Sequence, residues 1–198
     1  MLNKPKKSLG QNFLHDQNIL KTIVKHGNIK NNDQVLEIGP GTGNLTAHII
    51  SQKPKKIFLI EKDKVLSSEL KKKFKSKVEI ITNDILKISS DFYKDKNFII
   101  FGNLPYNIST KILTQLCLNE FLLVTKLILM FQKEVADRII AEPNNSNYGR
   151  LSIISNWKLN IKKICDIKPN AFSPKPKIES SLLLFYPKKD FIKINNPQ

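Results

Sequence analysis

Four consecutive residues could together activate an amine: Asn103, Leu104, Pro105 and Tyr106. The amine on a nucleobase is a poor nucleophile because its lone pair is delocalised into the ring. The side-chain oxygen of Asn103 and the backbone carbonyl of Leu104 could each accept one N–H, which would favour a pyramidal nitrogen with its lone pair free. Pro105 restricts the backbone, and Tyr106 offers a face on which a base can stack. These residues predict an alkylation site for a base amine, although the tetrapeptide alone is equally typical of a plain turn.

The elements around this tetrapeptide should place it at the edge of a sheet. Residues 98–101 form an apolar run long enough for a buried strand, and Gly102 bounds it. In open parallel α/β sheets, ligands bind at the C-terminal edge of the strands. We therefore expect a site directly after this strand, with Ser109 capping the helix that follows.

A glycine-rich turn follows an earlier strand, expected over residues 34–38. Gly39, Gly41 and Gly43 form the pattern G-x-G-x-G, which departs from the dinucleotide fingerprint G-x-G-x-x-G. Glycines allow sharp turns and close approach of a ligand, and the helix beginning near Asn44 supplies free N–H groups. The pattern favours a nucleoside ligand without a pyrophosphate, which weakens a nicotinamide-dependent oxidoreductase as an interpretation.

Polar residues end three successive predicted strands. Glu61 is placed to accept hydrogen bonds from ribose hydroxyls. Asp84 could accept from the amino group of a cofactor adenine whose ring packs on Ile85, and Asn103 ends the third strand. This repetition is the main specific signal in the sequence, because chance would scatter such residues.

The remaining pattern predicts one α/β domain over residues 1–198. We expect helices at about 16–26, from 44, at 63–74 and at 133–141, and strands at 34–38, 56–60, 78–82, 98–101, 126–131, 151–157 and 181–186. Residues 168–177 are too rich in proline for regular structure. Phe172 in this segment is expected to be exposed between lysines and to suit stacking on an extruded base, with a core anchor as the alternative.

The charge of the chain points to a polyanionic partner. The net charge is +16 over 198 residues, which suits RNA, DNA or an acidic membrane surface. Residues 1 to about 15 include a basic arm, within which Asn12 and Leu14 could cover a ligand. The two cysteines fit no metal-binding spacing, so we predict no metal site. No apolar run approaches the roughly 20 residues of a bilayer span and no signal-peptide core is present, so we expect a cytoplasmic protein without a membrane partner.

Six segments resemble the ribosomal RNA adenine dimethyltransferase family, in the family's order. They are residues 9–14 (LGQNFL), 36–46 (LEIGPGTGNLT), 103–109 (NLPYNIS), 132–138 (QKEVADR), 148–152 (YGRLS) and 172–177 (FSPKPK). The segments at 37–41 and 103–106 are closer to the housekeeping small-subunit enzyme than to the erythromycin-resistance branch. This resemblance implies a Rossmann-like class I fold that binds S-adenosyl-L-methionine, with a mostly parallel seven-stranded sheet and an antiparallel last strand.

The resemblance also implies a reaction and its site. The reaction is N6,N6-dimethylation of two adjacent adenosines near the 3′ end of small-subunit rRNA, by a monomer acting on a pre-ribosomal particle and contributing to a check on subunit assembly. Matched by motif, the cofactor site comprises Asn12, Leu14, Gly39, Gly41, Glu61, Asp84, Ile85 and Asn103. The target amine is held by Asn103, Leu104 and Tyr106, with Phe172 on the opposite face of the adenine. Family members usually continue into a small helical C-terminal domain, which we expect to be absent or truncated because the sequence ends soon after Tyr186.

Three other functions use similar residues. A large-subunit rRNA methyltransferase of the antibiotic-resistance type shares the fold, and a DNA adenine-N6 methyltransferase needs the same amine chemistry. Enzymes of the DNA class generally have an aspartate where this chain has Asn103. An RNA-binding assembly factor could keep the fold without turnover, and the presence of Glu61, Asp84 and Asn103 argues against it.

Overall fold

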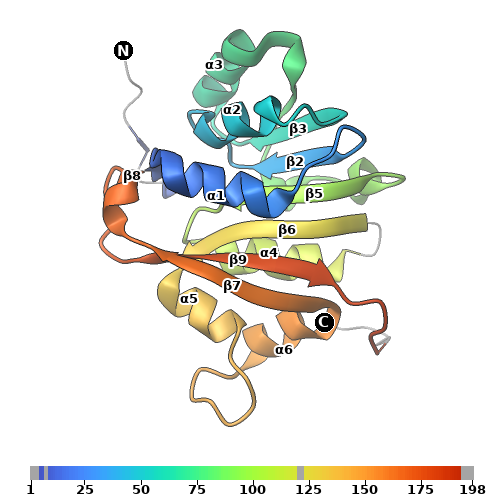
Figure 1. The fold of residues 1–198 in the computed structure, drawn as a ribbon, viewed down its shortest axis with the longest axis vertical. Helices are drawn as coiled ribbons and strands as arrows, with labels where there is room; N and C mark the ends of the chain where they lie inside the picture. Colours follow the sequence, from blue (N-terminus) through green and yellow to red (C-terminus); the bar gives the residue numbers. More distant parts are fainter. Residues whose placement is uncertain (1–4, 7–8, 120–122, 193–198) are drawn as a thin grey trace.

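A computed structural model describes residues 5–6, 9–119 and 123–192 of the chain. Part of the predicted basic arm, residues 1–4 and 7–8, lies outside this description. The described residues form helices on both faces of one central sheet (Figure 1).

The central sheet has seven strands in the order β4-β3-β2-β5-β6-β9-β7. Its members are β2 (Gln34–Ile38), β3 (Lys56–Glu61), β4 (Glu79–Thr82), β5 (Asn97–Asn103), β6 (Leu123–Gln132), β7 (Leu159–Ile167) and β9 (Ser180–Pro187). The first five strands in this order pair in parallel, whereas β9 runs antiparallel to both β6 and β7. The predicted fold class is therefore confirmed. A second, two-stranded sheet joins β1 (Phe13–Leu14) to β8 (Phe172–Ser173).

Helices cover both faces because the buried strands are apolar on both sides. Successive residues of a strand point to opposite faces, so Leu36 and Ile38 pack into one hydrophobic cluster and Val35 into the other. The helices are α1 (Gln17–Gly27), α2 (Asn44–Ser51), α3 (Lys64–Phe74), α4 (Ser109–Leu118), α5 (Lys133–Ile139) and α6 (Arg150–Lys158). Residues of α1 and α2 belong to one cluster, and residues of α4 and α5 to the other.

Side-chain caps begin two of the six helices described, α1 and α3. Asp16 accepts hydrogen bonds from the backbone N–H groups of Asn18 and Ile19 and so caps α1. Ser109 is not a cap: it is the first residue of α4, and its hydroxyl donates to the carbonyl oxygen of Tyr106 at 3.2 Å. The prediction was wrong by one residue, and the hydroxyl instead tightens the loop before the helix.

The prediction of a strand over residues 151–157 was wrong. This segment lies within α6, where the buried hydroxyl of Ser152 donates to the carbonyl oxygen of Arg138 at 2.6 Å. Packing against α5 therefore outweighs the strand preference of the β-branched residues. The strand comes next, as β7, and it was missed because its Lys162, Lys163 and Asp166 interrupt the apolar pattern. Charged residues of this kind are common on edge strands, where they discourage pairing with other chains.

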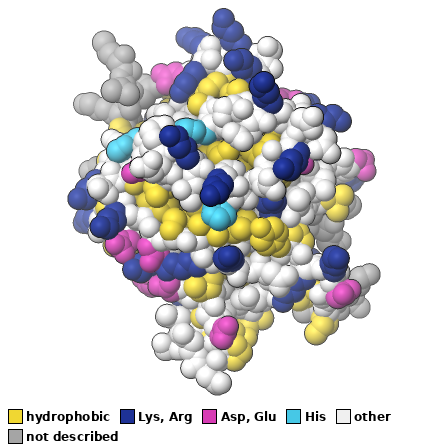
Figure 2. All heavy atoms as spheres, in the orientation of Figure 1, with side chains coloured by type: hydrophobic (Ala, Val, Ile, Leu, Met, Phe, Trp, Pro, Cys, Tyr) yellow, Lys and Arg dark blue, Asp and Glu magenta, His cyan; other side chains and the backbone are white. Residues whose placement is uncertain are grey.

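The surface carries the expected excess of positive charge. Figure 2 shows more lysine and arginine side chains than acidic ones on the face that α1 crosses. Among the helices that the structure describes, none has both the length and the apolar character needed to span a bilayer.

Candidate functional site

A cavity opens at the C-terminal edge of β2, β3 and β5, where the sequence predicted a site. It contains about 1130 Å³ of space free of protein atoms, part of it open to solvent. The structure brings to this cavity the predicted residues Asn12, Leu14, Gly39, Gly41, Glu61, Asp84, Ile85, Asn103, Leu104, Pro105 and Tyr106.

The glycine turn after β2 exposes backbone to the cavity. Gly39 and Gly41 have φ angles of +67° and +57°, which residues with a side chain rarely adopt. A Cβ at Gly41 would lie 2.8 Å from Cδ1 of the Phe13 ring, so the turn fits closely beneath the segment that contains Phe13. Glycine is therefore required at position 41 for conformation and for space.

Glu61 at the end of β3 is held by main-chain donors. Its Oε2 accepts from the N–H of Gly41 at 3.1 Å, and its Oε1 accepts from the N–H of Asp63 at 2.8 Å. Burial raises the pKa of this carboxyl, while the two backbone hydrogen bonds oppose the shift. Each carboxylate oxygen can accept a further hydrogen bond, so Glu61 can still bind ribose hydroxyls.

Asp84 and Ile85 lie at the start of the segment after β4. One oxygen of Asp84 accepts from the N–H of Leu86 at 3.0 Å, and the other forms a salt bridge with Lys62 at 2.9 Å. Partial burial raises the pKa of Asp84, but these contacts outweigh it and leave the pKa below its usual value. Asp84 is therefore ionised at neutral pH beside the buried side chain of Ile85, an arrangement suited to an adenine amino group and ring.

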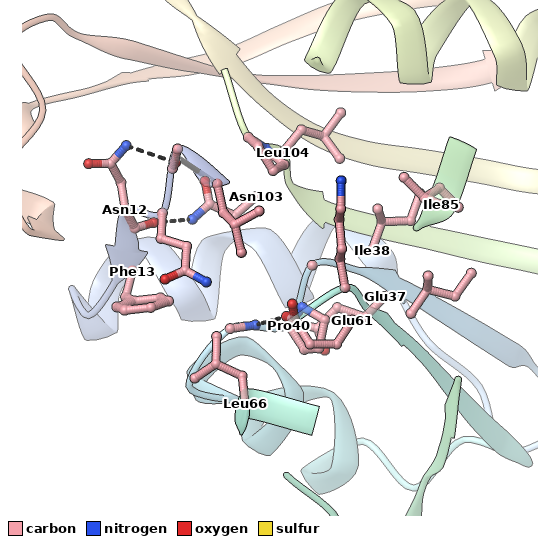
Figure 3. A pocket seen from close by; sticks show the side chains of 18 of the residues that line it. Asn12, Phe13, Glu37, Ile38, Pro40, Glu61, Leu66, Ile85, Asn103 and Leu104 are labelled. Carbon is pink, nitrogen blue, oxygen red and sulfur yellow. Dashed lines mark hydrogen bonds between the residues drawn. The ribbon is translucent and has the colours of Figure 1, made fainter. Parts of the chain in front are cut away.

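Asn103 lies at the end of β5 with its amide oriented by a backbone contact. Its Nδ2 donates to the carbonyl oxygen of Asn12 at 2.7 Å, so its Oδ1 remains as the acceptor (Figure 3). Leu104 as a whole residue is 1% exposed, and its side chain packs in the core. Both residues line the cavity, as the proposed amine chemistry requires.

The turn that follows holds Tyr106 against another part of the chain. The N–H of Ile108 donates to the carbonyl oxygen of Pro105 at 3.1 Å. The hydroxyl of Tyr106 lies 2.6 Å from Oγ of Ser180, the first residue of β9. Burial raises the pKa of the Tyr106 phenol while the hydrogen bond with Ser180 opposes the shift, so the ring is neutral at physiological pH.

Residues 9–14 cross the cavity as a strap, defined here as the segment from Leu9 to Leu14. Gln11 donates to Oδ2 of Asp63 at 3.2 Å, and Lys6 forms a salt bridge with the same oxygen at 2.8 Å. At its other end the strap pairs with β8. The sequence predicted that Asn12 and Leu14 cover a ligand, but it did not predict Asp63 as the residue that binds the strap.

Glu37 is a cavity residue that the sequence analysis missed. It is 2% exposed, and its Oε2 accepts from the hydroxyl of Thr46 at 2.7 Å. Burial raises the pKa of Glu37 to about 8, the Thr46 hydrogen bond opposes this, and the nearby charge of Glu61 adds to it. An acidic residue inside an otherwise apolar strand was a usable signal, because buried carboxyls are rare outside functional sites.

Phe172 does not have the exposed position that we predicted. Its side chain is 3% exposed and packs in the hydrophobic cluster of α1, and its backbone pairs with Leu14. It does not line the cavity. The prediction was wrong because pairing of β8 with β1 draws this segment of the proline-rich stretch against the core. Within the described residues, no three histidine, cysteine, aspartate or glutamate side chains are grouped as a metal site would require.

Comparison with known proteins places this geometry in a family. Residues 2–196 match the family described as ribosomal RNA adenine dimethylase. The chain belongs to this family. The predicted resemblance is thereby confirmed, and the strap, the glycine turn and the segment after β5 are three of its six matching segments.

Named relatives agree with this assignment. The chain is 58% identical over 200 residues to the ribosomal RNA small subunit methyltransferase A of Pelagibacter ubique, covering all of this chain and 76% of that protein. It is 44% identical over 189 residues to the protein of the same name from a Wolbachia strain of Drosophila simulans, covering 94% of this chain and 69% of the relative.

Solved structures share the fold. A dimethyladenosine transferase from Plasmodium falciparum matches with a TM-score of 0.81 and 33% identity, over 89% of this chain and 64% of that chain. The 23S rRNA methyltransferase ErmE matches with a TM-score of 0.80 at 20% identity, over 93% of this chain and 73% of that chain, and so supports the fold alone.

S-adenosylmethionine is the methyl donor of this family, and the cavity fits it. The turn at Gly39 and Gly41 allows close approach to the backbone, and Glu61 and Asp84 offer carboxylate oxygens for a ribose and an adenine amine. The combination suits a nucleoside without phosphates, since the cavity carries the carboxylate of Asp84, whose pKa lies below its usual value and which would repel a pyrophosphate.

Proposed function

We propose that this chain transfers two methyl groups to N6 of each of two adjacent adenosines near the 3′ end of small-subunit rRNA. It acts as a monomer, in the cytoplasm, on a pre-ribosomal particle. The observation that supports this most directly is the oriented amide of Asn103, whose Oδ1 is left as an acceptor in a cavity that also holds the glycine turn.

The cofactor half of the cavity would be formed by the strap and the ends of β2, β3 and β4. Glu61 would accept from the ribose hydroxyls and Asp84 from the adenine amino group, with Ile85 against the ring edge. Asn12 and Leu14 would cover the ligand from the strap. When bound, S-adenosylmethionine supplies an electrophilic methyl group on its sulfonium sulfur.

The target half would be formed by the segment after β5. In the first transfer, Oδ1 of Asn103 and the carbonyl oxygen of Leu104 would each accept one N–H of N6, and the nitrogen lone pair would point to the donor side of the cavity. In the second transfer N6 has a single N–H left, which one of these two oxygens would accept. Tyr106 would stack on the extruded adenine, and Pro105 would keep the loop in shape. Catalysis is then mostly positioning, and after each transfer N6 releases one proton. Phe172 has no part in this arrangement because its ring is buried.

The test is methylation of small ribosomal subunits that lack these methyl groups, read by mass spectrometry of the product nucleosides. The wild-type chain should yield N6,N6-dimethyladenosine. The variant Asn103→Ala should lose about 10²- to 10³-fold in kcat, a loss typical for one oriented polar group, with cofactor affinity changed less than about threefold. The matched control is Asn97→Ala, at the other end of the same strand, which should behave as the wild type.

Three results would contradict the proposal. Full activity of Asn103→Ala would remove the amine mechanism. Cofactor binding without methylation of any RNA would indicate an assembly factor on the same fold. Faster methylation of large-subunit rRNA or duplex DNA than of small subunits would assign the chain to a different substrate.

A further inference from the structure

One hydrogen bond joins the proposed base-stacking ring to β9, the last strand of the central sheet in chain order. The hydroxyl of Tyr106 lies 2.6 Å from Oγ of Ser180. Tyr106 lines the cavity and is partly buried, whereas Ser180 is 0% exposed. The two residues are 74 positions apart in the chain, so the contact is formed by the tertiary fold and not by neighbouring residues of one segment.

Ser180 is held rigidly from both sides. As the first residue of β9 it pairs with Gln132 of β6 and with Ile167 of β7. The preceding residue, Glu179, accepts from the N–H of Lys133 at 3.0 Å through its carbonyl and forms a salt bridge with the same lysine at 2.9 Å. The serine oxygen is therefore a fixed point beside the cavity.

We infer that Ser180 is a positioning residue for the methyl-transfer reaction, acting by fixing the tip of the Tyr106 ring. This inference rests on the proposed function. The backbone of Tyr106 is held by the turn after β5 and its hydroxyl by Ser180, so the ring is held at both ends. A ring held at both ends presents one orientation to an adenine. The stacked base is then already oriented with its amine toward Asn103 and the Leu104 carbonyl.

Removing the bond should therefore reduce the rate of transfer and leave binding unchanged. Ser180→Ala should lower kcat about tenfold, because small errors in the placement of reacting groups are costly. The KM for ribosomal subunits should change less than about twofold, since phosphate contacts away from the cavity dominate that affinity. Cofactor affinity should also stay within twofold.

The neighbouring residue supplies a matched control. Ser181 is also 0% exposed, but consecutive strand residues face opposite ways, and its hydroxyl donates to Oδ1 of Asp166 at 2.6 Å. Ser181→Ala removes one buried serine hydroxyl from the same strand without touching Tyr106. We expect it to keep wild-type kcat.

The decisive measurement is a double-mutant cycle. Tyr106→Phe removes the same hydrogen bond from the other side and keeps the ring, so it should also lose about tenfold in kcat. The double variant Ser180→Ala/Tyr106→Phe should lose no more than either single variant, because one interaction cannot be lost twice. Urea denaturation of each variant shows whether it is folded under the assay conditions, and Tyr106→Phe still tests the bond should Ser180→Ala fail to fold.

Each outcome has a distinct meaning. The inference is overturned by a Ser180→Ala kcat within twofold of the wild type, by equal losses in Ser180→Ala and Ser181→Ala, or by a loss near a hundredfold in the double variant. A wild-type chain that does not methylate small subunits overturns the proposed function instead.

Discussion

Glu37 shows how a single buried carboxyl sets a pH dependence. Its pKa is raised to about 8 mainly by burial, whereas the same group in the unfolded chain titrates near 4.5. The folded state therefore binds the proton more tightly, and its stability falls as pH rises from about 4.5 to about 8. Glu61, also raised by burial, acts in the same direction.

Replacing Glu37 with glutamine should remove most of this dependence. Each unit of pKa difference corresponds to about 1.4 kcal/mol, so the wild type should lose on the order of 4 kcal/mol from this group between pH 5 and pH 9. Glu37→Gln should show a much flatter profile and be the more stable protein above pH 8. Urea denaturation at a series of pH values measures this, and parallel profiles for the two proteins would show that Glu37 is not the cause.

At the scale of single residues, the sequence predicted best where a polar residue directly follows a strand. Glu61, Asp84 and Asn103 could be predicted because parallel strands bring their ends to one edge. Glu37 was not predicted as a site residue because the apolar residues around it indicate only a buried strand. Phe172 was misplaced because its burial depends on pairing with Leu14, a contact between distant segments that local composition does not encode.

At the scale of elements, the glycine turn and the strap depend on each other. Gly41 has a φ of +57°, and a Cβ there would lie 2.8 Å from the Phe13 ring of the strap. The turn that shapes the cofactor site thus also determines how closely the strap can approach the backbone at Gly41. A side chain at position 41 would affect both.

Gly41→Ala should therefore weaken both stability and cofactor binding. We expect a loss of about 1–3 kcal/mol in the free energy of unfolding from the strained backbone and the displaced ring, and about tenfold weaker binding of S-adenosylmethionine. Gly149→Ala is the matched control, because φ there is −172° and no atom lies within 4 Å of the added Cβ. Urea denaturation and calorimetry measure the two quantities. Equal free energies of unfolding and equal cofactor affinities for the two variants would show that the close fit at Gly41 contributes to neither.

Element types were predictable where the apolar pattern was continuous and failed where distant contacts decided them. The strands from β2 to β6 and β9 are mainly apolar along their centres and were predicted. Residues 151–157 also contain β-branched side chains, but they lie in helix α6. There Ser152 donates to the carbonyl oxygen of Arg138 and Asn156 donates to that of Ile139, the last two residues of α5. The edge strand β7 was missed because its exposed face is charged.

At the scale of the whole molecule, the positive charge exceeds what internal ion pairs can absorb. If each of the 17 acidic residues paired with one of the 33 basic residues, 16 basic residues would remain for a polyanion. Pairs such as Lys6 with Asp63 and Lys62 with Asp84 already use part of the basic set near the cavity. The remaining charge is sufficient for many phosphate contacts.

RNA affinity should consequently fall steeply with salt. With six or more phosphate contacts, the binding constant for small-subunit rRNA should drop on the order of 10²- to 10³-fold between 50 and 200 mM salt, because bound counterions are released. Cofactor affinity measured in the same buffers should vary less than about threefold and serves as the control. An RNA affinity that does not change with salt would show that the excess lysines reflect the composition of the chain and do not contact phosphates.

The position of β9 has a consequence for how the protein is made. It lies between β6 and β7, yet it follows both in the chain, so the pairing of the sheet cannot be completed until residues 180–187 leave the ribosome. Ser180 is the first residue of β9, so its hydrogen bond with the hydroxyl of Tyr106 cannot form before this strand is made. We therefore expect a nascent chain that still lacks β9 to hold the Tyr106 ring less rigidly than the finished protein does.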